Sequence, residues 1–317
     1  MSILSRPYFH DDAAAFAYLE AVMWPHGPEC PHCGCVSNIK KIAPNTVKRV
    51  RLGLHRCGDC KKQFTVTVGT VFEASKVPLH KWMQAVFLMS SSKKGVSAHQ
   101  LHRGLEVTYK TAWFMAHRIR EAMREGALLP PFGQDGGVVE VDETFIGHDK
   151  TKKPKGMKKG RGYAHKHKVL ALVDRNTGKA RMMVVDDLNV STLLPILREN
   201  MAKEAVLMTD EAQYYKPSLP TTSRCGHSMG EYVSRHDPLT HTNTIEGCFS
   251  VFKRGMKGVY QHCGKRHLHR YAAEFEFRYN NRSANGVEDV ERTELTLRGG
   301  RGKRLTSQRP DSVLARA

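Results

Sequence analysis

The chain has 317 residues, of which 40% are hydrophobic and 26% charged, as in an ordinary globular protein long enough for one large domain or several smaller ones. The formal net charge of +19 is unusual and indicates an anionic partner, most commonly nucleic acid. No apolar run approaches the length of a membrane span, and the N-terminus lacks a signal-like apolar region, so we expect a cytoplasmic protein with no membrane partner.

The first 75 residues are expected to combine a helix with a metal-binding module. Residues 1–25 have apolar residues at helical spacing, and Pro25 ends the pattern. Five of the eight cysteines then fall between residues 30 and 60, in CPHCGC and CGDC. Clustered cysteines in a reducing compartment more often bind metal than form disulfides. The segment QFTVTVGT after the second pair reads as a strand.

The two cysteine pairs predict a structural Zn²⁺ site. Zinc takes four thiolate or imidazole ligands in a tetrahedron, and each C-x-x-C turn presents two thiolates. The 23 residues between the pairs are compatible with an intervening hairpin. Four thiolates leave no open position for chemistry, so catalysis must reside elsewhere. The expected ligands are Cys30, Cys33, Cys57 and Cys60. The alternatives are Cys35 in place of Cys33, a redox pair, or spare thiols.

Residues 76–127 are expected to form a helix-turn-helix segment that binds DNA. PLHKWMQAVFLM and KTAWFMAHRIREAMRE both carry apolar residues three and four apart, which predicts two helices. Gly104, between them, resembles the turn of a helix-turn-helix, so residues 109–124 would be the recognition helix. The basic residues on its polar side are Lys110, Arg118, Arg120 and Arg124.

A linker rich in Pro and Gly, residues 128–137, precedes a second domain predicted at 137–285. VVEVDETFIG, KVLALVD, ARMMVVDD and AVLMTD read as strands, and LLPILRENMA and residues 241–254 as helices, so we expect an α/β domain with a mixed sheet. Residues 148–168 hold nine Lys or Arg against one Asp, which indicates nonspecific DNA affinity or a solvated loop. The candidates there are Lys152, Lys153, Lys155, Lys158, Lys159 and Arg161. Residues 286–317 read as a basic, flexible tail.

Two carboxylates end apolar strands in the second domain. Alternation puts Asp142 on the same strand face as Glu140, and Asp210 ends the strand AVLMTD. An acid at the end of a buried strand is costly unless it is paired or binds a cation. Carboxylates from adjacent strand ends would form the hard oxygen site that Mg²⁺ accepts. Each acid taken alone could instead be a solvated loop residue.

The segment HTNTIEGCFSVFKR carries a polar stripe on a predicted helix. The stripe, which spans about 80° of a helical wheel, consists of Asn243, Glu246, Ser250 and Lys253. The opposite, apolar side consists of Ile245, Phe249, Phe252 and Met256. An N-terminal capping box with Asn243 as the cap is the alternative explanation. Capping would not account for Lys253, two turns further along.

Taken together, these residues resemble a known family. Asp142, Asp210 and Glu246, with 35 residues between the last two and Lys253 seven after the Glu, resemble the D, D, E and E-x6-K pattern of DDE transposases. More narrowly, the chain resembles the ISXO-like insertion-sequence transposases with an N-terminal zinc ribbon over roughly residues 10–285. The motifs that carry the resemblance are CPHCG, CGDCKKQFTVTVGTVFE, PLHKW, KTAWFMAHRIREAM, VEVDETFIG, TDEAQYY and HTNTIEGCFSVFKRGMKGVY.

The resemblance implies a ribonuclease H-like catalytic domain that cleaves and transfers DNA strands at the terminal inverted repeats of a bacterial insertion sequence. Two Mg²⁺ or Mn²⁺ ions would be held by Asp142, Asp210 and Glu246. Asn243 would be a neighbour or an auxiliary ligand, and it remains the alternative for the third position. Lys253, and less strongly Arg254, would hold a phosphate.

The implied partner is double-stranded DNA, bound by a homo-oligomer that is nucleoid-associated while on DNA. A catalytically inactive or domesticated zinc-ribbon and helix-turn-helix regulator would share every basic feature without needing the three acids. A structure-selective nuclease with the same fold and metals would cleave without joining. These two activities are the alternatives to transposition.

Overall fold

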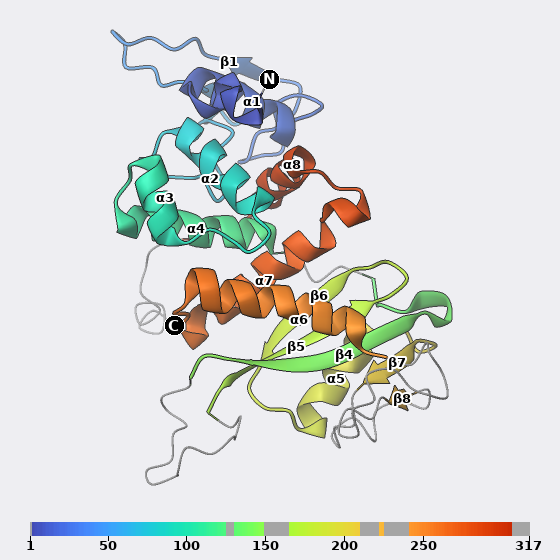
Figure 1. The fold of residues 1–317 in the computed structure, drawn as a ribbon. Helices are drawn as coiled ribbons and strands as arrows, with labels where there is room; N and C mark the ends of the chain where they lie inside the picture. The colour runs from blue at the N-terminus through green and yellow to red at the C-terminus, as the bar shows by residue number, and fades with distance from the viewer. Residues whose placement is uncertain (1, 125–129, 149–164, 210–221, 225–240, 306–317) are drawn as a thin grey trace, which may run out of the picture. The chain divides into compact units, whose positions relative to one another are not determined.

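The computed structural model describes residues 2–124, 130–148, 165–209, 222–224 and 241–305. The chain forms two compact units (Figure 1). Unit 1 comprises Met1–Ser92, Val96–Arg124 and Glu288–Ala317, and unit 2 comprises Lys93–Gly95 and Glu125–Val287. None of the helices in the described part of the chain combines the length and apolar character needed to span a bilayer.

Unit 1 begins with two short 3₁₀ turns and a helix, followed by a small three-stranded sheet. The helical elements are η1 (Ile3–Ser5), η2 (Pro7–Phe9) and α1 (Asp12–Met23). The strands are β1 (Ile39–Lys41), β2 (His55–Cys57) and β3 (Gln63–Phe64), antiparallel in that order. The expected strand QFTVTVGT is therefore too long, because only its first two residues belong to a strand. The chain turns directly afterwards, with Val68 N donating to Thr65 O at 3.0 Å.

Three helices form the middle of unit 1. They are α2 (Leu79–Ser91), α3 (Ala98–Leu105) and α4 (Tyr109–Met123). Ser97 and Gln100 form a capping box that starts α3. Gly104 lies inside α3, so its predicted role as the turn residue is wrong. The turn is made by Glu106, which has a left-handed φ of 51° and donates its N–H to His102 O.

The C-terminal part of unit 1 is helical where a flexible tail was expected. Residues Asp289–Gly299 form α8, which contacts α2 and buries Leu297 completely. Ser90 and Thr296 share a hydroxyl hydrogen bond of 2.9 Å between the two helices. The predicted tail beginning at residue 286 is corrected accordingly, because a few apolar residues on one face of a polar segment suffice to dock a helix.

Unit 2 is built on a five-stranded mixed sheet with the order β6-β5-β4-β7-β8 (Figure 1). The strands are β4 (Val138–Ile146), β5 (His167–Asp174), β6 (Ala180–Val185), β7 (Val206–Thr209) and β8 (Thr222–Arg224). The first three are antiparallel neighbours, whereas β7 pairs parallel with both β4 and β8. The crossover from β6 to β7 runs through α5 (Val190–Asn200), as an α/β arrangement requires.

Helices cover both faces of this sheet. One apolar cluster joins Val139 and Val141 of β4 to Leu193 and Leu197 of α5. A second cluster joins β5 and β6 on the opposite face to α6 and α7. The helical elements of that face are α6 (Asn243–Gly255), the π-helical turn η7 (Met256–Tyr260) and α7 (Lys265–Asn280), and η8 (Ser283–Asn285) follows. Because side chains alternate along β4, the even-numbered residues of the strand face α6.

Candidate active site and zinc centre

The four predicted zinc ligands converge in unit 1. The Sγ atoms of Cys30, Cys33, Cys57 and Cys60 all lie within 4.8 Å of one another. Two cross-pairs are closer, at 3.7 Å for Cys30 to Cys60 and 3.6 Å for Cys33 to Cys57. A tetrahedron with Zn–S bonds of about 2.3 Å places its sulfurs about 3.8 Å apart, so the cluster fits Zn²⁺. Cys35 groups instead with Cys57 and Asp59, which does not support it as a replacement for Cys33.

Backbone hydrogen bonds shape the two cysteine turns and favour the thiolate form of Cys57. The first knuckle is closed by Gly34, which has a φ of 74° and donates its N–H to Cys30 O at 2.9 Å. In the second knuckle, the backbone N–H groups of Cys60 and Asp59 lower the pKa of Cys57 to about 7. The thiolate is the form that binds metal, so this turn favours the ligating form of Cys57.

Asp142 lies in the central part of unit 2, on the face of β4 that α6 covers. It sits opposite Ala171 of β5, a member of the apolar cluster beneath α6 and α7. Its side chain is half-buried, and its Oδ1 accepts a hydrogen bond from Glu143 N at 2.7 Å. The structure therefore places this carboxylate at a boundary between the apolar layer and solvent.

The polar stripe of α6 has the orientation that the helical wheel predicts. Asn243, Glu246 and Lys253 are exposed, whereas Ile245 and Phe252 are completely buried. Because α6 contacts β4, the helix that carries Glu246 packs against the strand that carries Asp142. The burial pattern is confirmed, and the catalytic roles of the exposed residues remain predictions.

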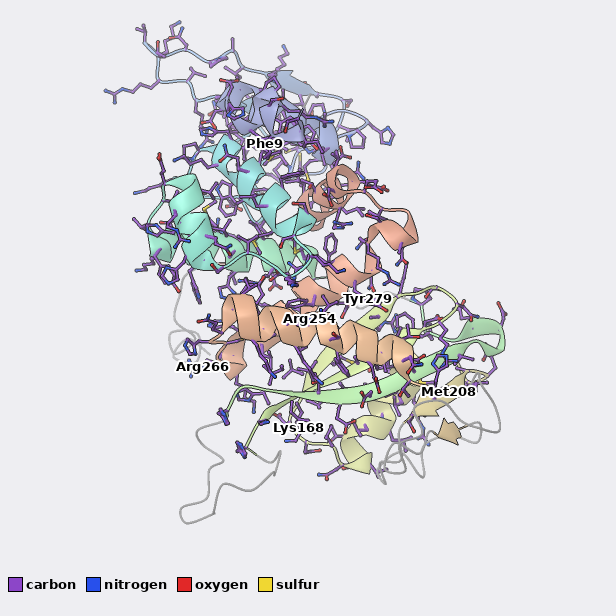
Figure 2. All side chains as sticks on the ribbon, in the orientation of Figure 1. Phe9, Lys168, Met208, Arg254, Arg266 and Tyr279 are labelled. Atoms are coloured by element: carbon purple, nitrogen blue, oxygen red, sulfur yellow. The ribbon has the colours of Figure 1, made fainter. Side chains whose placement is uncertain are left out.

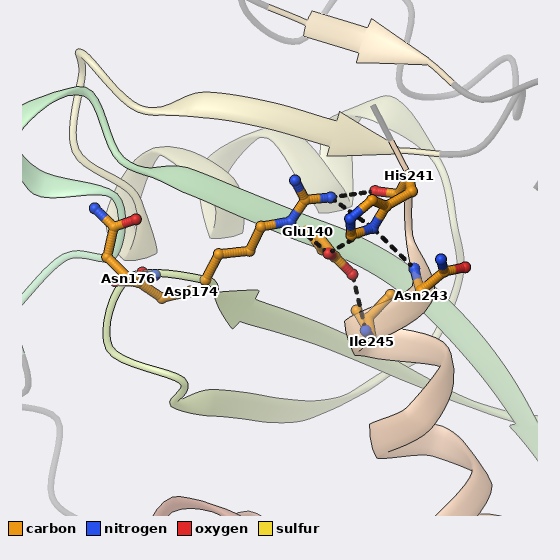
Figure 3. A network of polar contacts seen from close by, with 7 residues as sticks. Glu140, Asp174, Asn176, His241, Asn243 and Ile245 are labelled. Carbon is orange, nitrogen blue, oxygen red and sulfur yellow. Dashed lines mark hydrogen bonds and ion pairs between the residues drawn. The ribbon is translucent and has the colours of Figure 1, made fainter. Parts of the chain in front are cut away.

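The start of α6 is capped in a way the sequence did not predict. Thr242 is the N-cap residue and makes no side-chain capping bond, so the capping box with Asn243 as cap is wrong. Instead, Glu140 of β4 accepts a hydrogen bond from Ile245 N at 2.8 Å (Figure 3). Arg175 and His241 complete this network. The only signal in the sequence was an acid at position 140, inside an apolar strand.

The third predicted acid, Asp210, lies outside the described residues. The strand that precedes it in the sequence, β7, ends at Thr209 and pairs parallel with β4. Glu140 is level with Met208, which Figure 2 labels on β7. The structure therefore describes the strand that leads to Asp210 but not the acid itself.

Two of the predicted DNA-binding residues are buried. Arg118 is 7% exposed and donates to the backbone carbonyls of Val71 and Glu73, both at 2.9 Å. Arg120 is 2% exposed. Their assignment to a DNA-facing surface is corrected, because side chains with so little exposed surface are not accessible to phosphates. A helix of mixed character gives no reliable polar side from its sequence alone.

Other predicted basic residues remain exposed. Lys110 and Arg124 of unit 1 are both exposed, and Arg124 pairs with Glu121 at 3.0 Å. On α6, Lys253 Nζ lies 5.7 Å from the ring centre of Phe249. Arg254, which Figure 2 labels, donates to Ser250 Oγ at 2.5 Å. The predicted basic residues outside the described part of the chain are Lys152, Lys153, Lys155, Lys158, Lys159 and Arg161.

Comparison with known proteins agrees with both modules. Residues 135–280 match the family described as "ISXO2-like transposase domain", and residues 10–63 match the "Transposase zinc-ribbon domain". A protein of Halobacterium salinarum, described as an uncharacterized protein in transposable element ISH50, is 29% identical over 260 residues, covering 78% of this chain and 83% of that protein.

A solved viral assembly is a more distant neighbour. It is the intasome of simian T-cell lymphotropic virus in complex with the PP2A regulatory subunit B56 gamma. The match covers 61% of this chain and 64% of that chain, which is less than two thirds of its length, at 13% identity and a TM-score of 0.26. So low a score carries no structural argument.

The family match to unit 2 implies a ribonuclease H-like fold, and the observed mixed sheet with helices on both faces agrees with it. The zinc-ribbon match covers both cysteine pairs, whose four Sγ atoms the structure brings together. With both family models matched in sequence order and a relative within a transposable element, residues 135–280 carry an ISXO2-like transposase domain and residues 10–63 a transposase zinc ribbon.

Proposed function

We propose that the protein cleaves and joins DNA strands at the ends of its insertion sequence, with divalent metal bound by Asp142, Asp210 and Glu246. The observation that carries this proposal is the hydrogen bond from Ile245 N to Glu140, because it fixes the start of α6 beside the strand that holds Asp142. The parallel pairing of β4 with β7 supports the inclusion of Asp210, which follows β7 directly in the sequence.

The carboxylates would bind the metal, and the metal would activate a water or a 3′-hydroxyl and stabilise the leaving oxygen at phosphorus. Asp142, half-buried at the edge of an apolar layer, would bind more tightly than a fully solvated acid, since its surroundings screen charge less. Asn243 is exposed at the first turn of the same helix as Glu246, so its amide oxygen could serve as an auxiliary ligand.

Exposed basic residues would hold the DNA. Lys253 lies two turns after Glu246 on the same face of α6, where it could contact a phosphate next to the reacting one. Arg254, Lys110 and Arg124 are exposed as well. The net charge of +19 supports a partner as anionic as duplex DNA. Joining two element ends requires both in one complex, so we expect a homo-oligomer on DNA.

The test compares the wild type with Asp142→Asn and with Glu143→Gln, on labelled duplexes that carry the sequence flanking the gene. The first variant removes a carboxylate charge on the α6 face of β4, and the second removes one from the adjacent residue on the opposite face. We expect Asp142→Asn to lose Mn²⁺-dependent cleavage and joining by at least about 100-fold, while end binding persists. Glu143→Gln should stay within a few-fold of wild type.

Three outcomes would contradict the proposal in different ways. Normal joining by Asp142→Asn would remove this residue from the site. End binding by the wild type with no metal-dependent cleavage would favour the inactive regulator. Cleavage without joining would favour a nuclease. Binding should also weaken steeply with salt, by about 0.9 in log–log slope for each phosphate contact.

A further inference from the structure

We infer that Glu140 is a positioning residue, which clamps the start of α6 onto β4 so that Glu246 and Asp142 can serve one metal site. This inference rests on the proposed function, because it assigns the clamp to that same site. It adds three residues that neither the sequence motifs nor the family description assigns, namely Glu140, Arg175 and His241.

Glu140 uses its two carboxylate oxygens for two different elements. Its side chain is completely buried, at 0% exposure. Oε2 accepts a hydrogen bond from Ile245 N at 2.8 Å, and Oε1 accepts one from Arg175 Nε at 2.6 Å (Figure 3). The amide of Ile245 belongs to the first turn of α6, where backbone N–H groups have no partner within the helix. A carboxylate there also interacts favourably with the helix dipole.

The turn between β5 and β6 fixes Arg175 in place. Asp174 Oδ1 accepts hydrogen bonds from the N–H groups of Asn176 and Thr177, at 2.8 Å and 3.3 Å. Arg175 itself donates its backbone N–H to Val138 O at the start of β4. Backbone hydrogen bonds therefore hold Arg175 and the residues that follow it, which fixes the position from which the guanidinium contacts Glu140.

Arg175 also holds the chain segment that enters α6. Its Nη2 donates to the carbonyl of His241 at 2.6 Å and to the ring Nδ1 of His241 at 2.9 Å. Asn243 N points at the same Nδ1 from 3.4 Å. The same Nδ1 also lies 3.5 Å from Glu140 Oε1, so the imidazole contacts all the other members of the network. The entry to α6 is thus held through its backbone as well as through Ile245.

These contacts separate the role of Glu140 from that of Asp142. A carboxylate that already accepts from a guanidinium and a helix amide, with no exposed surface, is poorly placed to bind a metal as well. Asp142 lies two residues further along the same strand face, about 6.8 Å away at the strand rise. Glu246 directly follows Ile245. Asp142 and Glu246 are therefore each within two residues of a clamped atom.

The test measures Mn²⁺ binding by calorimetry on the full-length protein, with Glu140→Gln as the probe. A glutamine keeps the size but turns one oxygen into a donor, which then faces either Arg175 Nε–H or Ile245 N–H. The matched control is Glu274→Gln in α7, since Glu274 is also 0% exposed and paired with an arginine, Arg278. Asp142→Asn defines which Mn²⁺ site belongs to the carboxylates.

We expect Glu140→Gln to weaken binding at the Asp142-dependent site roughly tenfold, the lower end of what lost outer-sphere support costs a metal site. High Mn²⁺ should restore its strand cleavage, whereas Asp142→Asn should not recover. Glu274→Gln should bind Mn²⁺ within twofold of wild type. Equal Mn²⁺ affinity in wild type and Glu140→Gln, or an equal loss in Glu274→Gln, would overturn the inference and leave the proposed function intact.

Hydrogen exchange supplies a readout that does not depend on metal. We expect faster exchange in a peptide covering residues 243–246 for Glu140→Gln, but not for Glu274→Gln, relative to wild type. Arg175→Lys should give the same result if Glu140→Gln does not fold, because a lysine cannot reach both Glu140 and the His241 carbonyl. Wild type that binds no Mn²⁺ dependent on Asp142 would refute the proposed function, and unchanged exchange in these variants would refute the clamp.

Discussion

Removal of one zinc ligand should unfold the ribbon of unit 1. The buried cluster at the four thiols consists of Cys30, Cys57 and Phe64, two of which are ligands themselves, and Trp24, Ile39 and Val68 pack against it partly buried. Burial of one large aromatic side chain contributes about 1.5–3 kcal/mol. A structural Zn²⁺ site contributes an apparent ~10–16 kcal/mol of binding free energy at neutral pH. The metal, rather than apolar packing, therefore decides whether this segment is folded.

The assay is metal analysis of purified variants together with limited proteolysis. We expect one zinc per chain in the wild type and less than about a tenth of that in Cys57→Ser, with new cleavage sites between residues 30 and 64. Cys263→Ser is the matched control, since Cys263 lies in unit 2 and should leave the zinc content unchanged. Cys35→Ser should also keep its zinc, which separates the two possible ligand sets.

Full zinc content in Cys57→Ser would refute this reasoning, because the remaining three thiols should not retain the ion through purification. Loss of zinc in Cys35→Ser with retention in Cys33→Ser would instead show that Cys35 is the fourth ligand. The sulfur distances of 3.6 and 3.7 Å, close to those of a zinc tetrahedron, are the reason we expect neither result.

Two further predictions concern packing and charge. Arg118→Ala should lower the free energy of unfolding by about 2–3 kcal/mol, because the carbonyls of Val71 and Glu73 lose their donor. Lys110→Ala should leave that free energy unchanged and reduce the slope of log affinity for DNA against log salt by about 0.9, as expected for one lost phosphate contact. The converse pattern would mean that Arg118 faces DNA. Gly255→Ala should cost about 1–3 kcal/mol because its Cβ would lie 2.3 Å from Phe275 Cζ. Gly247→Ala, with nothing within 4 Å, should cost nothing, and equal thermal melts for both would contradict the close approach at Gly255.

The sequence predicted best where one strong period dominates. Strands β4, β5, β6 and β7 and the helix from Asn243 were expected nearly at their observed bounds, because continuous apolar runs and a clear 3.6-residue pattern leave few alternatives, whereas β8 was not expected. The cysteine spacing predicted the zinc cluster for a similar reason, since tetrahedral chemistry limits which residues can meet.

Contacts between distant segments explain the predictions that failed. Arg118 looks like a surface residue in its own helix, but its buried guanidinium donates to the carbonyls of Val71 and Glu73, more than forty positions earlier. Gly104 was expected at the turn because glycine tolerates a positive φ, yet Glu106 adopts that conformation. The cap of α6 comes from a residue 105 positions away. Local patterns carry no information about such partners.

The two acids of β4 show what local pattern and tertiary contact each decide. The alternation of side chains places Glu140 and Asp142 on the same face of β4 and gives no reason to assign them different roles. Two carboxylates on the covered face of a sheet are costly unless each is neutralised. The structure neutralises Glu140 with the guanidinium of Arg175 at 2.6 Å and removes it from solvent. Asp142 remains half-buried and receives a backbone N–H. In the proposed function, a divalent ion bound at Asp142 would neutralise this second carboxylate, as Arg175 neutralises the first.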